Sequence, residues 1–188
     1  LKVTSEPIAR ATVEDIYTQI NDDLDNAIIN LEGFSRTNKS QISKTVALGL
    51  KARVALVQGN NIVARENAIK AREGYALMNT FNYFNNFSNY ASDEWIWGSH
   101  IIEDNTLSFA NYGAYISRNF SSSNIRGNPK AINSTLYHTI PTTDVRSQIF
   151  DPTGNHFVLP AGVTIPSNFS RKPYTSQKFI ANGTGDSR

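Results

Sequence analysis

Residues 12–31 read TVEDIYTQINDDLDNAIINL, and this stretch decides the fold class. Its apolar residues return every three or four positions, which is the spacing of one face of an α-helix. They are Val13, Ile16, Tyr17, Ile20, Leu24, Ala27, Ile28 and Leu31. Thr12 is placed to cap this helix, with Asp15 reaching back to it in a capping box, and Gly33 is placed to end it. The stretch predicts an amphipathic helix held by its apolar stripe.

Two more helices are predicted further along the chain. Ser43 is placed to cap the first, which runs to about Gln58, and the second runs from about Ile62 to Tyr75. Small residues would let the two axes approach closely as an antiparallel pair, namely Ala47, Ala52, Ala55, Ala64 and Ala68. A pair of this kind, closed by a tyrosine, resembles a tetratricopeptide repeat unit. Because one unit cannot bury both of its faces, the repeat interpretation implies neighbouring units.

The composition changes beyond Met78. Before it the chain is rich in Ala, Leu, Ile and charge, whereas Asn, Ser, Tyr, Phe, Gly and Pro dominate after it. We therefore predict a mostly α fold, with a helical tetratricopeptide-like portion at residues 1–80 and a long, irregular, loop-rich portion with short strands at residues 81–188. Trp95 and Trp97 alternate along one such predicted strand, which would place both rings on one face.

Charge and cysteine content exclude several classes of protein. The chain has 188 residues and a formal net charge of +2, without a sustained run of Lys and Arg, so nucleic-acid binding is not expected. It has no cysteine, which excludes disulfides, thiolate nucleophiles and cysteine-ligated zinc. The sequence also contains no stretch of about eighteen apolar residues that would span a membrane.

No catalytic motif is present in the sequence. His100, His138 and His156 lie far apart without the spacing of metal ligands. A Gly-x-Ser-x-Gly elbow, a P-loop and a dinucleotide-binding fingerprint are all absent. The acidic cluster of residues 22–25 spreads around a helix, so a solvated helix face is favoured over a cation site. We expect no enzyme activity, no metal and no cofactor.

Several short motifs follow one another in a distinctive order. They are RATVEDIY at 10–17, DLDNA at 23–27, the alanine-rich helix ending in QGN at 58–60, GYAL at 74–77, DEWIW at 93–97, LY at 136–137, DVR at 144–146, and Tyr174 followed by KF at 178–179. In this order the motifs resemble the SusD/RagB family of outer-membrane nutrient-binding proteins, and the chain resembles an internal fragment of such a protein, one incomplete SusD-like domain.

The resemblance implies a function and a location. It implies a non-catalytic carbohydrate-binding protein at the surface of the bacterial outer membrane, which assists nutrient uptake in polysaccharide utilisation. The expected partners are a glycan or oligosaccharide and a TonB-dependent transporter of the SusC type. Such proteins are lipoproteins, and this chain lacks the lipid-bearing cysteine, so we expect membrane attachment only through an anchor on the parent chain. Within the resemblance, Asp144 and Arg146 are structural and tie a loop.

Candidate glycan-binding residues lie mainly in the loop-rich portion. Aromatic rings stack on the apolar faces of sugars, while Asn and Arg side chains bind vicinal hydroxyls. Residues 109–126 combine these types, and the candidates there are Asn111, Tyr112, Tyr115, Arg118, Asn119 and Arg126. A loop packed on the helical scaffold is an equally good interpretation of this segment. Trp95 and Trp97 are further candidates, although core packing is favoured over ligand contact for both.

Two other functions remain open. The chain could be a tetratricopeptide-like module that binds protein or peptide without sugar binding, using a concave helical surface around Arg53, Asn60 and Arg65. A glycoside hydrolase would need two carboxylates roughly 5 to 10 Å apart across one cleft. The loop-rich portion is poor in carboxylates, so the hydrolase ranks last.

Overall fold

The computed structural model of the chain describes residues 9–85, 87, 89–99, 129–156, 164–165, 167 and 170–179. The chain divides into two compact units, Leu1–Tyr75 and Ala76–Arg188. Helices are the main regular structure among the described residues, and the strands there are few and short. The predicted mostly helical fold class is confirmed at this level.

Helix α1 (Val13–Asn30) begins and ends where the sequence predicts. The hydroxyl oxygen of Thr12 accepts a hydrogen bond from the Asp15 backbone N–H at 3.1 Å, and the Asp15 carboxylate accepts one from the Thr12 backbone N–H at 3.4 Å. These two bonds form the predicted capping box. After the helix, Gly33 has a φ of 71°, a left-handed conformation that glycine adopts without steric cost.

The apolar stripe of α1 is covered only along part of its length. Leu24 is half-buried, but Val13 is 66% exposed and Ile16 is 50% exposed. The Asn21 side chain donates a hydrogen bond at 3.1 Å to the side chain of Gln58, the residue that ends α2. The first turns of α1 therefore project beyond the end of the helix that covers the stripe. The prediction that the whole stripe holds the helix is therefore corrected: only the C-terminal part of the stripe is covered.

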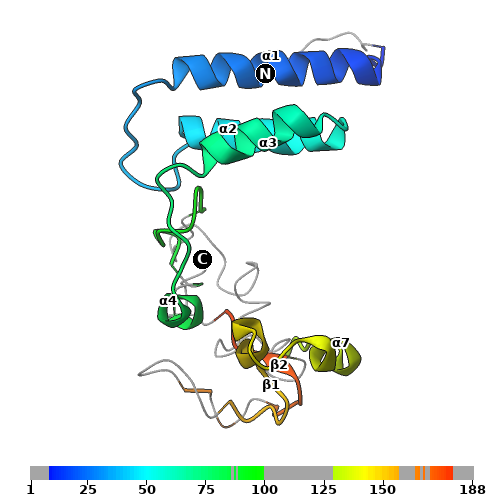
Figure 1. Cartoon of the computed structure of the whole chain (residues 1–188), viewed down its shortest axis with the longest axis vertical. Coiled ribbons are helices and arrows are strands. Elements are labelled where there is room, and N and C mark those ends of the chain that lie inside the picture. The colour runs from blue at the N-terminus through cyan, green and yellow to red at the C-terminus, as the bar shows by residue number, and fades with distance from the viewer. Residues whose placement is uncertain are drawn as a thin grey trace. The chain divides into compact units, whose positions relative to one another are not determined.

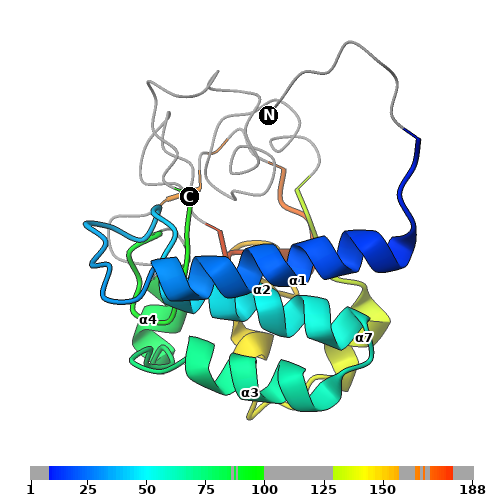
Figure 2. The same cartoon turned by 90° about the horizontal axis from the view of Figure 1, so that it is seen from above.

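Helices α2 (Lys44–Val57) and α3 (Asn61–Ala71) lie side by side in both views (Figure 1, Figure 2). Gly49, near the start of α2, lies so close to the end of α3 that an added Cβ would sit 3.9 Å from the Cβ of Ala71. The pair is therefore antiparallel. The buried alanines of the two helices are Ala47, Ala52, Ala55, Ala64 and Ala71. Because each contributes only a methyl group, the two helix axes can approach closely.

The predicted contact residue Ala68 is exposed, which corrects one member of the alanine set. Ala71, only 2% exposed, takes its place. With about 100° of rotation per residue, Ala68 points about 40° to one side of Ala64 and Ala71 about 20° to the other. Half-buried Asn67 lies on the Ala71 side, so the buried face of α3 turns away from Ala68.

The caps of α2 and α3 differ from the prediction. The Ser43 side chain does not cap α2, because its hydroxyl pairs with the Thr45 hydroxyl at 2.8 Å. Asn60, predicted only to end α2, also starts α3, since its side-chain oxygen accepts a hydrogen bond from the Val63 backbone N–H at 3.2 Å. Gly59, with a φ of 76°, makes the tight turn between the two helices possible.

The second unit contains short elements. Among its described residues they are α4 (Thr80–Asn85), α7 (Ser134–Thr139), the 3-10 helix η2 (Val145–Ile149), β1 (Phe150–Asp151) and β2 (Thr175–Ser176). The two strands pair antiparallel, with Phe150 opposite Ser176 and Asp151 opposite Thr175. Ala131 adds an isolated antiparallel bridge to Thr175. Thr175 is fully buried, so this small ribbon forms a local core.

The short strand predicted at Trp95 and Trp97 is wrong, because a turn at residues 93–94 and a bend at residue 96 interrupt the chain there. The Ser92 N–H donates to the Asn89 carbonyl at 3.1 Å, and the Trp95 N–H donates to the Ser92 carbonyl at 3.0 Å. The Asn89 side-chain oxygen also accepts a bond from the Ala91 N–H at 2.9 Å, which favours a turn over an extended chain. The alternation of the two tryptophans therefore does not place them on one strand face.

Candidate functional site

The two candidate tryptophans have different environments. Trp95 is half-buried, with its ring centroid 6.5 Å from that of Phe87. The Phe87 ring also packs against Tyr83 at 5.0 Å and Phe179 at 6.1 Å. Trp95 thus belongs to an aromatic cluster of Tyr83, Phe87, Trp95 and Phe179, as the core-packing interpretation favours. Trp97 is 52% exposed, so a ligand can reach its ring.

Charged groups surround this aromatic cluster. The Lys178 ammonium lies 4.1 Å from the centroid of the Phe87 ring, within cation–π range, and burial lowers the pKa of Lys178 while Glu94 opposes that shift. Burial raises the pKa of Tyr83; Arg146 opposes this rise. The Glu94 carboxylate accepts a hydrogen bond from the backbone N–H of Met78 at 2.8 Å. Apolar rings and polar groups therefore lie together, which is the mixture that a polar ligand with apolar faces requires.

The remaining predicted glycan-binding residues lie outside the described residues. They are Asn111, Tyr112, Tyr115, Arg118, Asn119 and Arg126. Their role stays a prediction from the sequence. Trp95 and Trp97 are the predicted site residues that the described part of the chain contains.

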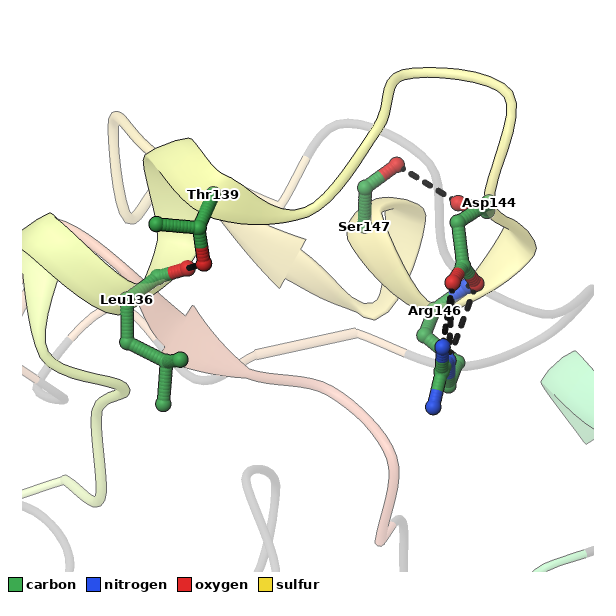
Figure 3. A network of polar contacts seen from close by, with 5 residues as sticks. All are labelled: Leu136, Thr139, Asp144, Arg146 and Ser147. Carbon is green, nitrogen blue, oxygen red and sulfur yellow. Dashed lines mark hydrogen bonds and ion pairs between the residues drawn. The ribbon is translucent and has the colours of Figure 1, made fainter.

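Asp144 and Arg146 form a local tie at the start of η2 (Figure 3). The Arg146 Nε donates to both carboxylate oxygens of Asp144 at 3.0 Å, and the Arg146 backbone N–H donates to the same carboxylate at 2.9 Å. The Ser147 hydroxyl donates to the Asp144 carbonyl at 2.8 Å. Hydrogen bonds from the Arg146 side chain and backbone lower the pKa of Asp144 to about 2. The predicted charge-assisted contact of this pair is present, and its structural role stays a prediction.

A buried polar network that the sequence did not predict surrounds β2. His156 is 4% exposed, and its Nε2 lies 2.6 Å from the Thr175 hydroxyl while its Nδ1 lies 3.1 Å from the side-chain oxygen of Gln177. The Asp151 carboxylate accepts a hydrogen bond from the His156 backbone N–H. Burial raises the pKa of Asp151, but hydrogen bonds from Thr153 and His156 outweigh this and the pKa is lowered. These contacts fasten residues 151–156 to the second strand.

The first unit carries a groove of 810 Å³ over its three helices. Lysines and carboxylates surround an apolar floor; the lining residues are Asp25, Ile28, Lys44, Thr45, Leu48, Lys51, Val63, Glu66, Asn67, Lys70 and Glu73. Lys44 pairs with Glu32, and Lys51 pairs with Asp25. No ion pair holds Lys70 within the part of the chain that the structure describes. The groove therefore presents charge of both signs.

None of Arg53, Asn60 and Arg65 lines this groove, so the interaction surface predicted around them is a different one and stays a prediction. Each residue turns a helix by about 100°, so Arg53 points about 160° away from Lys51 on α2. Lys44 and Lys51, seven positions apart, share a face. The spacing of the lysines on α2 was the sequence signal that could have located the groove.

Neither a metal-ligand cluster nor a membrane-spanning helix is present among the described residues. Among residues 9–99 and 129–179, with the gaps stated above, no three His, Asp or Glu side chains gather as metal ligands would. Within the same residues, no helix is both long and apolar enough to cross a membrane. A scan of the chain against protein-family models and a search of curated proteins found no match.

Proposed function

We propose that the chain is a SusD/RagB-type protein: a non-catalytic carbohydrate-binding protein at the bacterial cell surface that assists import through a TonB-dependent transporter of the SusC type. The observation that carries the proposal is the order of the motifs along the chain, from RATVEDIY at residues 10–17 to KF at 178–179. Each motif alone is weak. A shared order over most of the chain is much harder to obtain by chance.

Contacts of two motif residues support the proposal. Tyr75, from the GYAL motif, accepts a hydrogen bond from Arg36 at 2.8 Å and shares one with Thr45 at 2.9 Å, so it joins the end of α3 to the start of α2. A closing tyrosine of this kind suits a tetratricopeptide-like unit formed by α2 and α3. Asp144 and Arg146, from the DVR motif, tie their own segment, as structural motif residues would.

The sugar site that we propose combines Trp97 with the loop residues between 109 and 126. An exposed tryptophan ring can stack on the apolar face of a sugar, and the Asn and Arg residues of the loop can bind its hydroxyls. The sequence supplies no motif for a nucleophile or a catalytic metal, so binding without reaction is the simplest function for such a site. The parent protein would be held at the outer membrane by a lipid anchor.

A glycan array probed with the folded chain tests the proposal. We expect binding to a restricted set of oligosaccharides. Replacing Trp97→Ala should weaken that binding roughly tenfold without changing the melting temperature, because the lost burial of a large aromatic is worth about 1.5 kcal/mol or more. The matched variant Trp95→Ala should instead lower the melting temperature, since Trp95 packs on Phe87. A folded chain that binds no glycan on the array would overturn the proposal.

The groove over α1, α2 and α3 favours a second function, the binding of a peptide that carries charges of both signs. Lys70, Glu66 and Glu73 line it, and among the described residues no ion pair engages any of them. A peptide-binding module should lose peptide affinity on Lys70→Glu, measured by fluorescence anisotropy with a library of mixed-charge peptides. Glycan binding should not respond to that substitution. An unchanged affinity for every peptide would remove this candidate.

A further inference from the structure

A compact group of three aromatic side chains lies in the second unit, and none of them is among the predicted glycan-binding residues. Tyr137 and His138 are on α7, and Tyr174 directly precedes β2. The Tyr137 and Tyr174 ring centroids are 5.3 Å apart, and those of His138 and Tyr174 are 5.9 Å apart. The Tyr137 and His138 rings meet edge to face at 5.5 Å. Each of the three rings therefore contacts the other two.

The three-ring group lies at the surface. His138 is exposed, Tyr137 and Tyr174 are half-buried, and α7 has no buried residue. The Tyr174 hydroxyl lies 3.3 Å from His138 Nε2, so these two polar atoms of the group lie together. A surface that joins aromatic faces to a hydroxyl and an imidazole nitrogen is amphipathic in the same way as a sugar ring.

Tyr174 is held in a costly backbone conformation. Its φ is 61°, in the left-handed region, which costs a bulky L-residue roughly 1–2 kcal/mol. Its N–H donates to the Asp151 carbonyl at 2.7 Å, and its own carbonyl accepts from the Ile132 N–H at 3.1 Å, so neighbouring segments fix this conformation. Glycine would fit the position without strain. A tyrosine at this position therefore indicates that its ring has a function.

α7 is anchored in the same region. The Asn133 side-chain oxygen accepts hydrogen bonds from the backbone N–H groups of Thr135 at 2.9 Å and Leu136 at 3.2 Å, which caps the first turn. The Ile132 N–H is bonded to Tyr174, so the chain just before the helix is fastened to the strained residue. The rings on α7 and the ring of Tyr174 are thus preorganised relative to one another, which lowers the entropic cost of binding.

We propose that Tyr137, His138 and Tyr174 form a second binding platform for a neutral pyranose ring. This inference rests on the proposed function and adds a subsite to it, with residues different from Trp97 and the 109–126 loop. The planes of the two tyrosine rings are tilted by 56°, so the sugar stacks an apolar face on one of them, and its hydroxyls bond to the Tyr174 hydroxyl and to an imidazole nitrogen of His138. Because the group contains no carboxylate, lysine or arginine, it suits an uncharged sugar better than an ionic ligand.

Calorimetric titration of the whole chain tests the platform, with maltohexaose, cellohexaose and laminarihexaose as probes, together with any oligosaccharide that the array selects. Tyr174→Gly removes the ring and relieves the left-handed strain, so we expect affinity to fall roughly tenfold while the melting temperature changes little. Tyr137→Ala should weaken binding to a similar degree. Leu136→Ala, on the same helix and 56% exposed but outside the group, is the matched control and should bind as wild type.

The outcomes separate the platform from the proposed function. If wild type binds an oligosaccharide and both Tyr174→Gly and Tyr137→Ala bind it equally well, the platform is refuted while the proposed function stands. If wild type binds no probe and no array glycan, the proposed function fails and the platform with it. If Tyr174→Gly does not fold, His138→Ala decides, because its exposed ring is not needed for folding: weaker binding supports the platform, and unchanged binding refutes it.

Discussion

Removing one hydroxyl, by Tyr75→Phe, should destabilise the first unit measurably. The Tyr75 oxygen lies 2.8 Å from the Arg36 guanidinium and 2.9 Å from the Thr45 hydroxyl. It therefore joins three segments: the loop after α1, the start of α2 and the turn after α3. The substitution keeps the aromatic ring, over which the Lys39 ammonium lies at 5.6 Å from the centroid. The change thus isolates the two hydrogen bonds.

The expected size of the effect follows from these two bonds. A neutral hydrogen bond contributes about 0.5–1.5 kcal/mol net, and one to a charged group about 1.5–3 kcal/mol. Tyr75 is half-buried, so water replaces part of what Arg36 loses. We expect the free energy of unfolding to fall by about 2 kcal/mol for Tyr75→Phe. Tyr75→Ala should cost about 3 kcal/mol or more, because the ring contacts are lost as well.

Urea unfolding followed by far-ultraviolet circular dichroism measures this difference. Tyr17→Phe is the matched control, since Tyr17 is also half-buried in the first unit and no hydrogen bond of its hydroxyl is present among the described residues. The control should unfold like wild type. If Tyr75→Phe has the same unfolding midpoint as Tyr17→Phe, the hydroxyl does not fasten the three segments, and the closing role given to Tyr75 is refuted.

Three further predictions test other parts of the structure. Asp144→Asn should make the stability of the protein less dependent on pH. The folded pKa of Asp144 is lowered from 3.8 to about 2, so the carboxylate stabilises the fold above pH 3.8 and this contribution is lost as the pH falls towards 2. Urea unfolding midpoints measured near pH 2 and above pH 3.8 would detect the difference. Ala64→Leu should lower the free energy of unfolding by about 1–3 kcal/mol through overpacking, whereas Ala68→Leu on the exposed side should change it little; equal effects in denaturant titrations would contradict the assigned face. Leu24→Asp should lower the melting temperature strongly, because it places a charge on the half-buried side of α1. Asp25→Ala should lower it only slightly, because the Asp25 end of the Asp25–Lys51 pair is exposed to solvent.

The limits of the helices could be predicted because local chemistry fixes them. The capping box of Thr12 and Asp15 needs only residues close together in sequence, and so does the left-handed Gly33 after α1. The close approach of α2 and α3 could be predicted in part, since small side chains such as that of buried Ala64 let helix axes come together.

Features that depend on a distant partner could not be read in the same way. Val13 and Ile16 continue the apolar stripe in sequence, but the extent of α2, set by Gln58, decides that they are left exposed. Ser43 is a good cap by type, yet its hydroxyl pairs with that of Thr45, which in turn is bonded to the distant Tyr75 hydroxyl. A side-chain partner outside the local window therefore overrides a local preference.

The candidate site was predicted only in part. Alternation suggested a strand at Trp95 and Trp97, whereas the hydrogen bonds of Asn89 bend the chain into turns just before it. Tyr137 and Tyr174 belong to two motifs that lie far apart in sequence, so the sequence alone does not show that their rings meet. A left-handed backbone at Tyr174 likewise has no sequence signal, because tyrosine rarely adopts that conformation.

Titration of the folded chain with an array-selected oligosaccharide, followed by recovery and sizing of that oligosaccharide, is the most direct measurement of glycan binding without catalysis. We expect saturable binding, and we expect the sugar to be recovered intact after prolonged incubation. The Trp97→Ala variant should bind more weakly under the same conditions. Absence of saturable binding, or new reducing ends that disappear when an Asp or Glu is replaced, would contradict the proposed function.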